Sequence, residues 1–215
     1  MTRTCLRAPI LLCLWALVPA LSCPLPLYAQ TAQPYSVQAS GIMTLLLGNY
    51  EAEFDPVLGN QYINLGGGAG FELQVQRRMG VSSVGLGLQY TRHSGRVEDE
   101  GGFKVRNLDG DITVFGVFIE PRWPLLSFAT AGAAPYLAAR AGISRVSLPE
   151  EIGTEATGYT LNGGGGVLVR LSRQATLDFG LTAGLRNFGE ELGVFGNALL
   201  RVGVFIGIPS GGGGS

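Results

Sequence analysis

The sequence contains very little lysine, little charge of either sign, and no long apolar stretch beyond its first 30 residues. Lys104 is the only lysine in 215 residues, and charged residues make up 14% of the chain. Soluble proteins carry about a quarter charged residues, so a freely soluble globular surface is disfavoured. No run of 18 apolar residues follows residue 30, which excludes a transmembrane helix there. A formal net charge of −1 gives no support for a nucleic-acid partner.

The N-terminal segment has the pattern of a secretory signal peptide. Arg3 and Arg7 precede an apolar run from Ala8 to Leu21, and a small-residue cleavage pattern ends at Ala29. We therefore expect residues 1–29 to be removed during export. The last residues, 210–215, form a Gly/Ser-rich tail that resembles a flexible linker, either native or an expression scar.

Cysteine is absent from the expected mature chain, so no disulfide would stabilise it in an oxidising compartment. The three cysteines all lie within the first 23 residues: Cys5, Cys13 and Cys23. Lipid attachment at Cys23 is a weaker alternative, because Ala20-Leu21-Ser22 is a poor lipobox. An uncleaved anchor is also weaker, because the apolar run is too short to span a bilayer comfortably.

Alternation of apolar and polar residues dominates the rest of the chain. A period of two predicts β-strands with one apolar and one polar side. From Ile63 to Gln76 the apolar face comprises Ile63, Leu65, Gly67, Ala69, Phe71, Leu73 and Val75. Similar segments predict strands at 35–49, 61–77, 81–95, 107–123, 134–147, 157–171, 174–187 and 196–208. Only the fourth is ambiguous, because Phe115, Val117 and Ile119 alternate with Val114, Gly116, Phe118 and Glu120.

The connections between these strands differ in length. Those at 78–80 and 172–173 are tight, whereas those at 50–60, 96–106, 148–156 and 188–195 are longer and acidic. Short periplasmic turns and long extracellular loops are typical of outer-membrane barrels. Residues 124–133 are the exception, since a long apolar segment stands where a short turn is expected. We predict an all-β fold, an eight-stranded antiparallel up-and-down transmembrane β-barrel, within one domain at residues 30–209.

A soluble barrel of the lipocalin type is the alternative architecture, with its apolar face inside. The near-absence of lysine on the polar face and the aromatic residues near strand ends favour the membrane barrel. Four of these aromatics are expected at the membrane interfaces: Tyr35, Tyr90, Trp123 and Tyr159.

The signal peptide, the eight amphipathic strands and the final strand together resemble the small outer-membrane barrel proteins of the OmpA/OmpX/opacity-protein type, over residues 34–208. The resemblance implies that the barrel-assembly machinery reads the last strand during insertion. The residues matching that insertion signal are Arg201, Gly203, Ile206 and Ile208. The chain departs from the family pattern by continuing through Pro209 rather than ending on an aromatic residue. Outer-membrane lipids and lipopolysaccharide are the other partners that the resemblance implies.

Charged residues on the polar faces would point into a narrow lumen that side chains fill. They are Glu72, Glu120, Arg122, Arg140, Arg170, Asp178, Arg186 and Arg201. Buried charges must pair, so we predict a structural ion network, with a gate or conduction path as the alternative. A hairpin symmetric about residue 130 would place Glu120 opposite Arg140, and Arg170 lies one diagonal step from Asp178. Five arginines against three acids would leave the set net positive.

Glycine is unusually common on the polar face, where it either allows tightly curved strands to close or leaves a cavity for a small ligand. The glycines concerned are Gly66, Gly68, Gly70, Gly85, Gly87, Gly164, Gly166, Gly180, Gly184, Gly203 and Gly207. No phosphate-loop motif accompanies the glycine runs.

His93 is the only histidine, which disfavours enzymatic activity. Lipid A-modifying barrels use a Ser/His pair, but Ser94 would project to the opposite face of the strand from His93. We therefore expect no catalytic residue, and we place His93 near the outer rim. The spacing of metal ligands is also absent, so neither a metal nor a cofactor is expected.

Acidic residues gather in the long loops, as a solvated rim, a divalent-cation site bridging to lipopolysaccharide, or an adhesion surface. They are Glu51, Glu53, Asp55, Glu98, Asp99, Glu100, Glu150, Glu151, Glu155, Glu190 and Glu191. Arg92, Arg96 and Arg145 lie near the same rim and could contact lipid phosphates. The sequence favours a non-enzymatic outer-membrane protein with a structural or surface-interaction role. A narrow pore for small solutes and a lipid A-modifying enzyme are the alternatives, and the extracellular partner is unknown.

Overall fold

The computed structural model describes residues 34–55, 59–98, 103–125, 132–149, 155–172, 174–189 and 192–208, with backbone alone at 49–61, 106, 108 and 109. The expected signal peptide, its cysteines and the Gly/Ser tail lie outside these residues, as does most of the apolar segment 124–133. Within the described part of the chain, no helix is long and apolar enough to cross a membrane.

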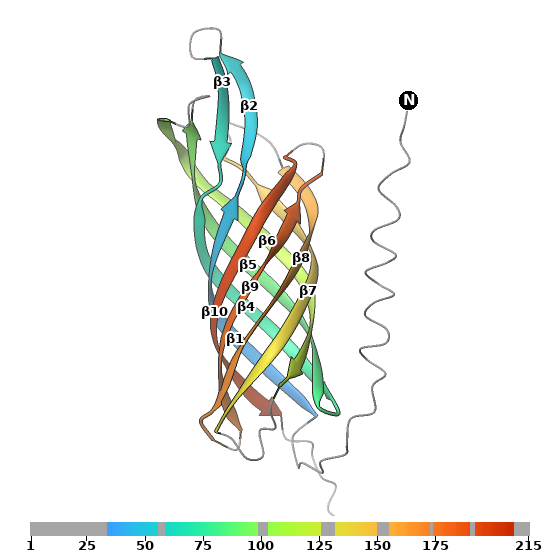
Figure 1. Cartoon of the computed structure of the whole chain (residues 1–215). Coiled ribbons are helices and arrows are strands. Elements are labelled where there is room, and N and C mark those ends of the chain that lie inside the picture. The colour runs from blue at the N-terminus through green and yellow to red at the C-terminus, as the bar shows by residue number, and fades with distance from the viewer. Residues whose placement is uncertain are drawn as a thin grey trace, which may run out of the picture. The chain divides into compact units, whose positions relative to one another are not determined.

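Ten strands form one antiparallel sheet that closes on itself (Figure 1). They are β1 (Tyr35–Leu47), β2 (Asn49–Asp55), β3 (Gly59–Asn64), β4 (Gly67–Met79), β5 (Ser82–Glu98), β6 (Lys104–Pro124), β7 (Ala133–Ser147), β8 (Glu155–Arg170), β9 (Ala175–Asn187) and β10 (Val194–Ile208). Eight of them make the ring β1-β4-β5-β6-β7-β8-β9-β10, and β10 pairs back onto β1. The predicted eight-stranded barrel is therefore confirmed.

The register around the ring fixes the tilt of the strands. Tracing the paired residues once around the ring from Ala39 leads back to the start of the ring at position 49. The register of the closed ring is therefore staggered by ten residues. A stagger of this size in a small barrel corresponds to a strand tilt of roughly 35–45°. Tyr35 pairs with Ile208, so the first and last strands begin and end at the same mouth. The tight turn at Gly80, with a φ of 65°, lies at this mouth too.

One predicted strand is in fact two. The segment 61–77 is interrupted at Leu65 and Gly66, where Asn64 Oδ1 accepts a hydrogen bond from the Gly66 amide and Gly66 takes a φ of 36°. The break reverses the apolar face: Ile63 and Leu65 are buried, whereas Phe71 is 54% exposed on the outside. The expectation that all seven apolar residues share one face is therefore wrong at its first two positions.

The predicted loop at 50–60 is also largely strand. β2 and β3 pair as a hairpin that projects beyond the ring at the long-loop end (Figure 1). Backbone pairing of Tyr62 with Glu98 attaches this hairpin to β5. The side chains of Glu51, Glu53 and Asp55 lie outside the described part of the structure.

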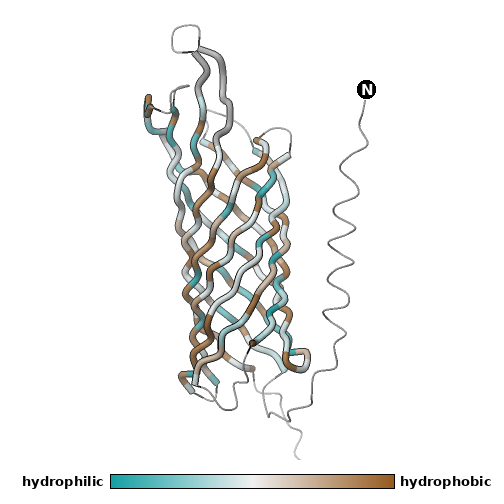
Figure 2. The backbone as a smooth tube through the Cα atoms, in the orientation of Figure 1, coloured by the Kyte–Doolittle hydropathy of each residue, from teal (hydrophilic) through white to brown (hydrophobic). Residues whose placement is uncertain are grey.

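Apolar side chains cover the outside of the ring, and polar ones fill its lower interior. Figure 2 shows the alternation of hydrophobic and hydrophilic residues along each strand. The outward apolar residues are well exposed, for example Leu86 at 63% and Leu181 at 59%. Strand β6 is no longer ambiguous: Phe115, Val117 and Ile119 face outward, and Phe118 and Glu120 are buried inside. Such an exposed apolar band matches a lipid-facing surface, and a soluble lipocalin-type arrangement is excluded.

Inward glycines let neighbouring strands approach closely. A Cβ at Gly184 would lie 1.9 Å from the Leu161 carbonyl oxygen, and one at Gly70 would lie 1.8 Å from that of Tyr90. At Gly203 the added atom would lie 2.1 Å from Ser40 Oγ. These contacts support the interpretation that the glycines allow a narrow, curved barrel to close, because the space is already filled by protein atoms.

Replacing Gly184 by Ala should destabilise the barrel by about 1–3 kcal/mol, because the methyl group overlaps the backbone of β8. Gly163→Ala is the matched control, since a Cβ at Gly163 meets no atom within 4 Å. Urea unfolding of both refolded variants, followed by tryptophan fluorescence, measures the difference. Equal midpoints for the two variants would contradict this account of the glycines.

Candidate functional site

Six charged side chains meet inside the barrel and form what we call the ion network. They are Glu72 on β4, Glu120 and Arg122 on β6, Arg140 on β7, Asp178 on β9 and Arg201 on β10. Each is 3% exposed or less. Five of the eight ring strands are therefore joined at one level by buried ion pairs.

Arg201 contacts all three acids of the network. Its guanidinium lies 3.2 Å from Glu72, 3.0 Å from Glu120 and 2.9 Å from Asp178. The hydroxyl of Tyr136 donates a 2.6 Å hydrogen bond to Asp178 and accepts one of 3.0 Å from Arg201. Arg201 belongs to the proposed insertion signal, so its position in the ring gives it a second, structural task in the folded protein.

Arg140 and Arg122 complete the network. Arg140 lies 2.5 Å from Glu120 and 2.8 Å from Glu72, and the register of β6 with β7 centres their hairpin on residue 130. The predicted contact between Glu120 and Arg140 is thus confirmed. Arg122 pairs with Glu120 at 2.6 Å and Asp178 at 3.1 Å. Amide oxygens of two glutamines that sequence analysis did not single out also contact Arg122: Gln38 and Gln74.

Two of the eight predicted luminal charges lie apart from the ion network. Arg170 has the inward parity of β8 but is exposed at the short-turn mouth. Arg186 is buried further up the barrel, where its Nε donates a 3.0 Å hydrogen bond to Thr160. The ion network proper holds three arginines and three carboxylates, so the positive excess of the predicted set of eight comes from Arg170 and Arg186, which lie outside this cluster.

Above the ion network the interior becomes apolar. The buried side chains there, which we call the apolar plug, are Leu46, Ile63, Leu65, Val97, Ile112, Val114, Val146, Ala156, Phe188, Leu192 and Phe195. Phe188 and Phe195 pack edge to face, with ring centroids 6.0 Å apart. Sequence analysis missed the plug, because it assumed a polar face throughout the lumen. The signal was the inward parity of Leu46 and Val114 on otherwise polar faces.

His93 lies inside the barrel beneath the apolar plug. It is 1% exposed, and its Nε2 lies 3.0 Å from Thr91 Oγ1 and 3.2 Å from Thr44 Oγ1. The expected position at the outer rim is therefore wrong. Ser94 is exposed on the outer face, as expected. The side chains that hydrogen-bond His93 are those of Thr91 and Thr44, and among the described residues no carboxylate forms a hydrogen bond with the imidazole, as the acid of a catalytic triad would.

Exposed ion pairs occupy the outer rim. Arg92 pairs with Asp111, Arg145 pairs with Glu155, and Arg96 lies 2.5 Å from Glu98. The hydrogen bond from Arg145 holds the pKa of the Glu155 carboxyl below its usual value. Six other rim acids lie outside the described residues: Asp99, Glu100, Glu150, Glu151, Glu190 and Glu191.

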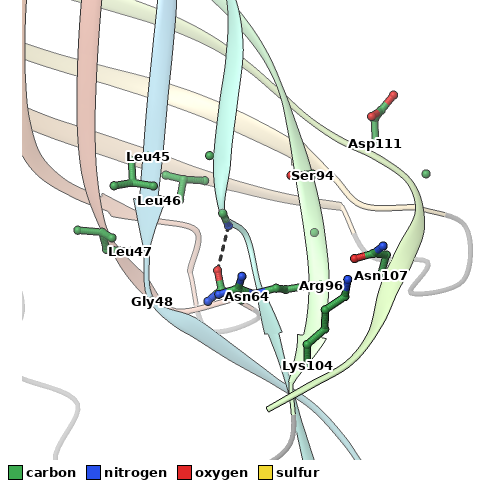
Figure 3. Close-up of a pocket in the computed structure, with 14 residues that line it drawn as sticks. Leu45, Leu46, Leu47, Gly48, Asn64, Ser94, Arg96, Lys104, Asn107 and Asp111 are labelled. Atoms are coloured by element: carbon green, nitrogen blue, oxygen red, sulfur yellow. Dashed lines mark hydrogen bonds between the residues drawn. The ribbon is translucent and has the colours of Figure 1, made fainter. Parts of the chain in front are cut away.

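A furrow of about 840 Å³ lies at the base of the β2–β3 hairpin (Figure 3). Leu45 and Leu47 of β1 form one side of it, and Arg96, Lys104 and Asn107 form the other (Figure 3). A second, more apolar hollow of about 580 Å³ shares some of its lining and extends down the lipid-facing wall. Together the two hollows are apolar along the lipid-facing wall and cationic toward the long-loop end.

The predicted interface aromatics lie on the outer surface near the two ends of the apolar band. Tyr35 and Trp123 are near the short-turn mouth, and Tyr90 and Tyr159 are nearer the long-loop end. The Tyr159 hydroxyl accepts a 3.1 Å hydrogen bond from Asn187. In the last strand, Gly203 faces inward, whereas Ile206 and Ile208 are exposed outside. Roles at the membrane interface and in insertion stay predictions.

Comparisons with known proteins agree on the fold. No protein-family model matches the sequence, and no curated protein matches it. The structure of Neisserial surface protein A is similar, with 17% identity, coverage of 83% of this chain and 100% of that chain, and a TM-score of 0.52. The outer membrane protein OprG of Pseudomonas aeruginosa is 10% identical, with coverage of 84% and 98% and a TM-score of 0.55. The chain therefore has the fold of the small outer-membrane β-barrel proteins, and its apolar belt places it in that membrane.

Replacing Glu120 by Gln should lower the free energy of unfolding by roughly 3–5 kcal/mol, because three buried arginines would then share two carboxylates. Asp111→Asn likewise replaces a carboxylate by an amide, but in an exposed ion pair at the rim. There we expect the free energy of unfolding to fall by only about 0–1 kcal/mol. Urea unfolding of both variants in one detergent measures the contrast. A small loss at Glu120, equal to that at Asp111, would argue against a stabilising ion network.

Proposed function

We propose that this protein is a closed, non-enzymatic barrel whose function resides at its outer surface. In this role it stabilises the envelope by holding lipid at its rim and displays the β2–β3 hairpin to extracellular partners. The observation that carries the proposal is the filled interior. Two successive layers, the ion network and the apolar plug, occupy the described lumen.

The filled interior disfavours conduction. Water-filled channels occur in barrels with many more strands, whereas an eight-stranded barrel has just enough room for its own side chains. A solute crossing here would have to separate buried ion pairs of 2.5–3.2 Å and then displace the packed side chains of the apolar plug. Both steps are costly, because each leaves charges or apolar surface without partners.

The outer rim supports a role in lipid binding. Lipopolysaccharide combines acyl chains with phosphates, and the paired hollows offer leucine side chains beside cationic ones. Arg92 and Lys104 are exposed at this level, and Arg96 lines the larger furrow. Guanidinium groups form strong charge-assisted hydrogen bonds with phosphate oxygens. We infer that the rim anchors the barrel in a lipopolysaccharide leaflet.

Single-channel recording in planar bilayers tests the closed lumen. The refolded mature chain, shown to be folded by heat-modifiable gel migration, should give no discrete openings. Arg140→Ala should stay closed too, because it removes one side chain from two buried ion pairs but leaves the apolar plug intact. Stable openings of the unmodified chain that change with Arg140→Ala would instead support the narrow pore.

Thermal unfolding in bilayers with and without lipopolysaccharide tests the rim. Lipopolysaccharide should raise the unfolding temperature of the unmodified chain, and the Arg92→Gln/Arg96→Gln/Lys104→Gln variant should lose most of that increase. The matched control is Arg77→Gln/Arg78→Gln, which removes cations at the opposite mouth. An equal increase in both variants would contradict the proposed rim contact.

A further inference from the structure

Arg186 is a buried cation that the ion network does not neutralise. It is 2% exposed, and no carboxylate of the described residues lies within ion-pair distance of it. Its Nε donates to Thr160, while its Nη1 is buried without a hydrogen-bond partner. An uncompensated charge in such a position is very costly, so a counter-charge is required.

The buried acids of the described chain are already engaged elsewhere. Glu72, Glu120 and Asp178 are matched by the three arginines of the ion network. Glu98 is held by Arg96 at the rim. The charge of Arg140, which has the same sign, also acts on Arg186. The described interior therefore carries one positive charge more than its carboxylates balance.

Hydrogen-bond donors surround the same part of the wall. Asn162 and Asn197 both pair in register with Gly184, from the strands on its two sides. Thr182 and Arg186 are the inward residues directly before and after Gly184 on β9. The Asn197 amide donates to Asn162 Oδ1 at 3.2 Å, which leaves Asn162 Nδ2 free. The inward side chains of Asn162, Asn197, Thr182 and Arg186 therefore lie on the same part of the barrel wall.

The free polar atoms of this region are four that can donate hydrogen bonds and one acceptor, Asn197 Oδ1. Asn162 Nδ2 and Arg186 Nη1 can only donate. The hydroxyls of Thr182 and Ser144 can donate as well, and Ser144 on β7 pairs with Gly158, two residues before Thr160. All four atoms are buried without a partner in the described structure. Orphaned donors at this density in a buried wall indicate a bound group that accepts hydrogen bonds.

The layers above and below limit the size of that group. Phe188, in the apolar plug, stacks near the Arg186 guanidinium at 5.9 Å from its ring centroid. Leu199 and Phe118 are buried on the side of the ion network. These layers favour a small ligand, and one negative charge would balance Arg186.

We propose that the barrel interior binds one small monovalent anion, such as chloride, against Arg186 Nη1. The Asn162 amide and the hydroxyls of Thr182 and Ser144 supply the remaining donors. The anion neutralises the upper interior in the way that the carboxylates neutralise the ion network. This site is independent of the surface role proposed above, because it depends on the interior alone.

Bromide is the probe for the test. The unmodified chain, Arg186→Gln and Arg145→Gln are refolded in a nonionic detergent, and sodium gluconate is replaced stepwise by sodium bromide at constant ionic strength. At a tenfold excess over its Kd, bromide should raise the thermal midpoint of the unmodified chain by roughly 3–6 °C. Arg145→Gln, which alters an exposed rim arginine, should show the same rise. Arg186→Gln should show none.

Anomalous diffraction from crystals of the unmodified chain grown in bromide gives a second readout, which does not depend on the folding of any variant. A bromide peak beside Arg186 Nη1 is expected. A bromide-independent midpoint, an equal rise in Arg186→Gln, or the absence of a peak at this position would each overturn the proposal.

Discussion

Neutralisation of charge inside a narrow closed ring is the constraint on which the rest of the structure depends. The eight strands bury whatever points inward, and a charge placed there gains no solvation from water. The ion network meets this constraint with three arginines and three carboxylates that are nearly inaccessible to solvent. These ion pairs form only if neighbouring strands lie close together, and inward glycines such as Gly203 allow the strands to do so.

The same network explains how the ring can be held together without disulfides. Arg201 on the last strand contacts acids on β4, β6 and β9, which are far apart in the sequence. These contacts form only when β10 has paired with β1 and the ring is closed. Since removing one partner leaves buried charge exposed to an apolar interior, the network favours the closed ring over open or slipped arrangements.

The interior is built in two tiers, and this division bears on function. The lower tier is ionic, whereas the upper tier is an apolar plug containing Phe188 and Phe195. A conducting barrel needs a continuous polar path, which the plug interrupts. The accessible features lie instead at the long-loop end, where the β2–β3 hairpin, the paired rim charges and the furrow in Figure 3 occur together. The balance of these observations favours a surface role.

The sequence by itself determined the transmembrane barrel, its eight ring strands, most inward and outward faces, and the pairing of Glu120 with Arg140. These follow from a period of two and from short hairpins, which are local properties of the chain. Only the tertiary structure decided the break at Gly66, the projecting hairpin, the apolar plug and the separation of Arg186 from the ion network. Each depends on the ten-residue stagger of the ring, which sets the level of every inward side chain and is not encoded in any single strand.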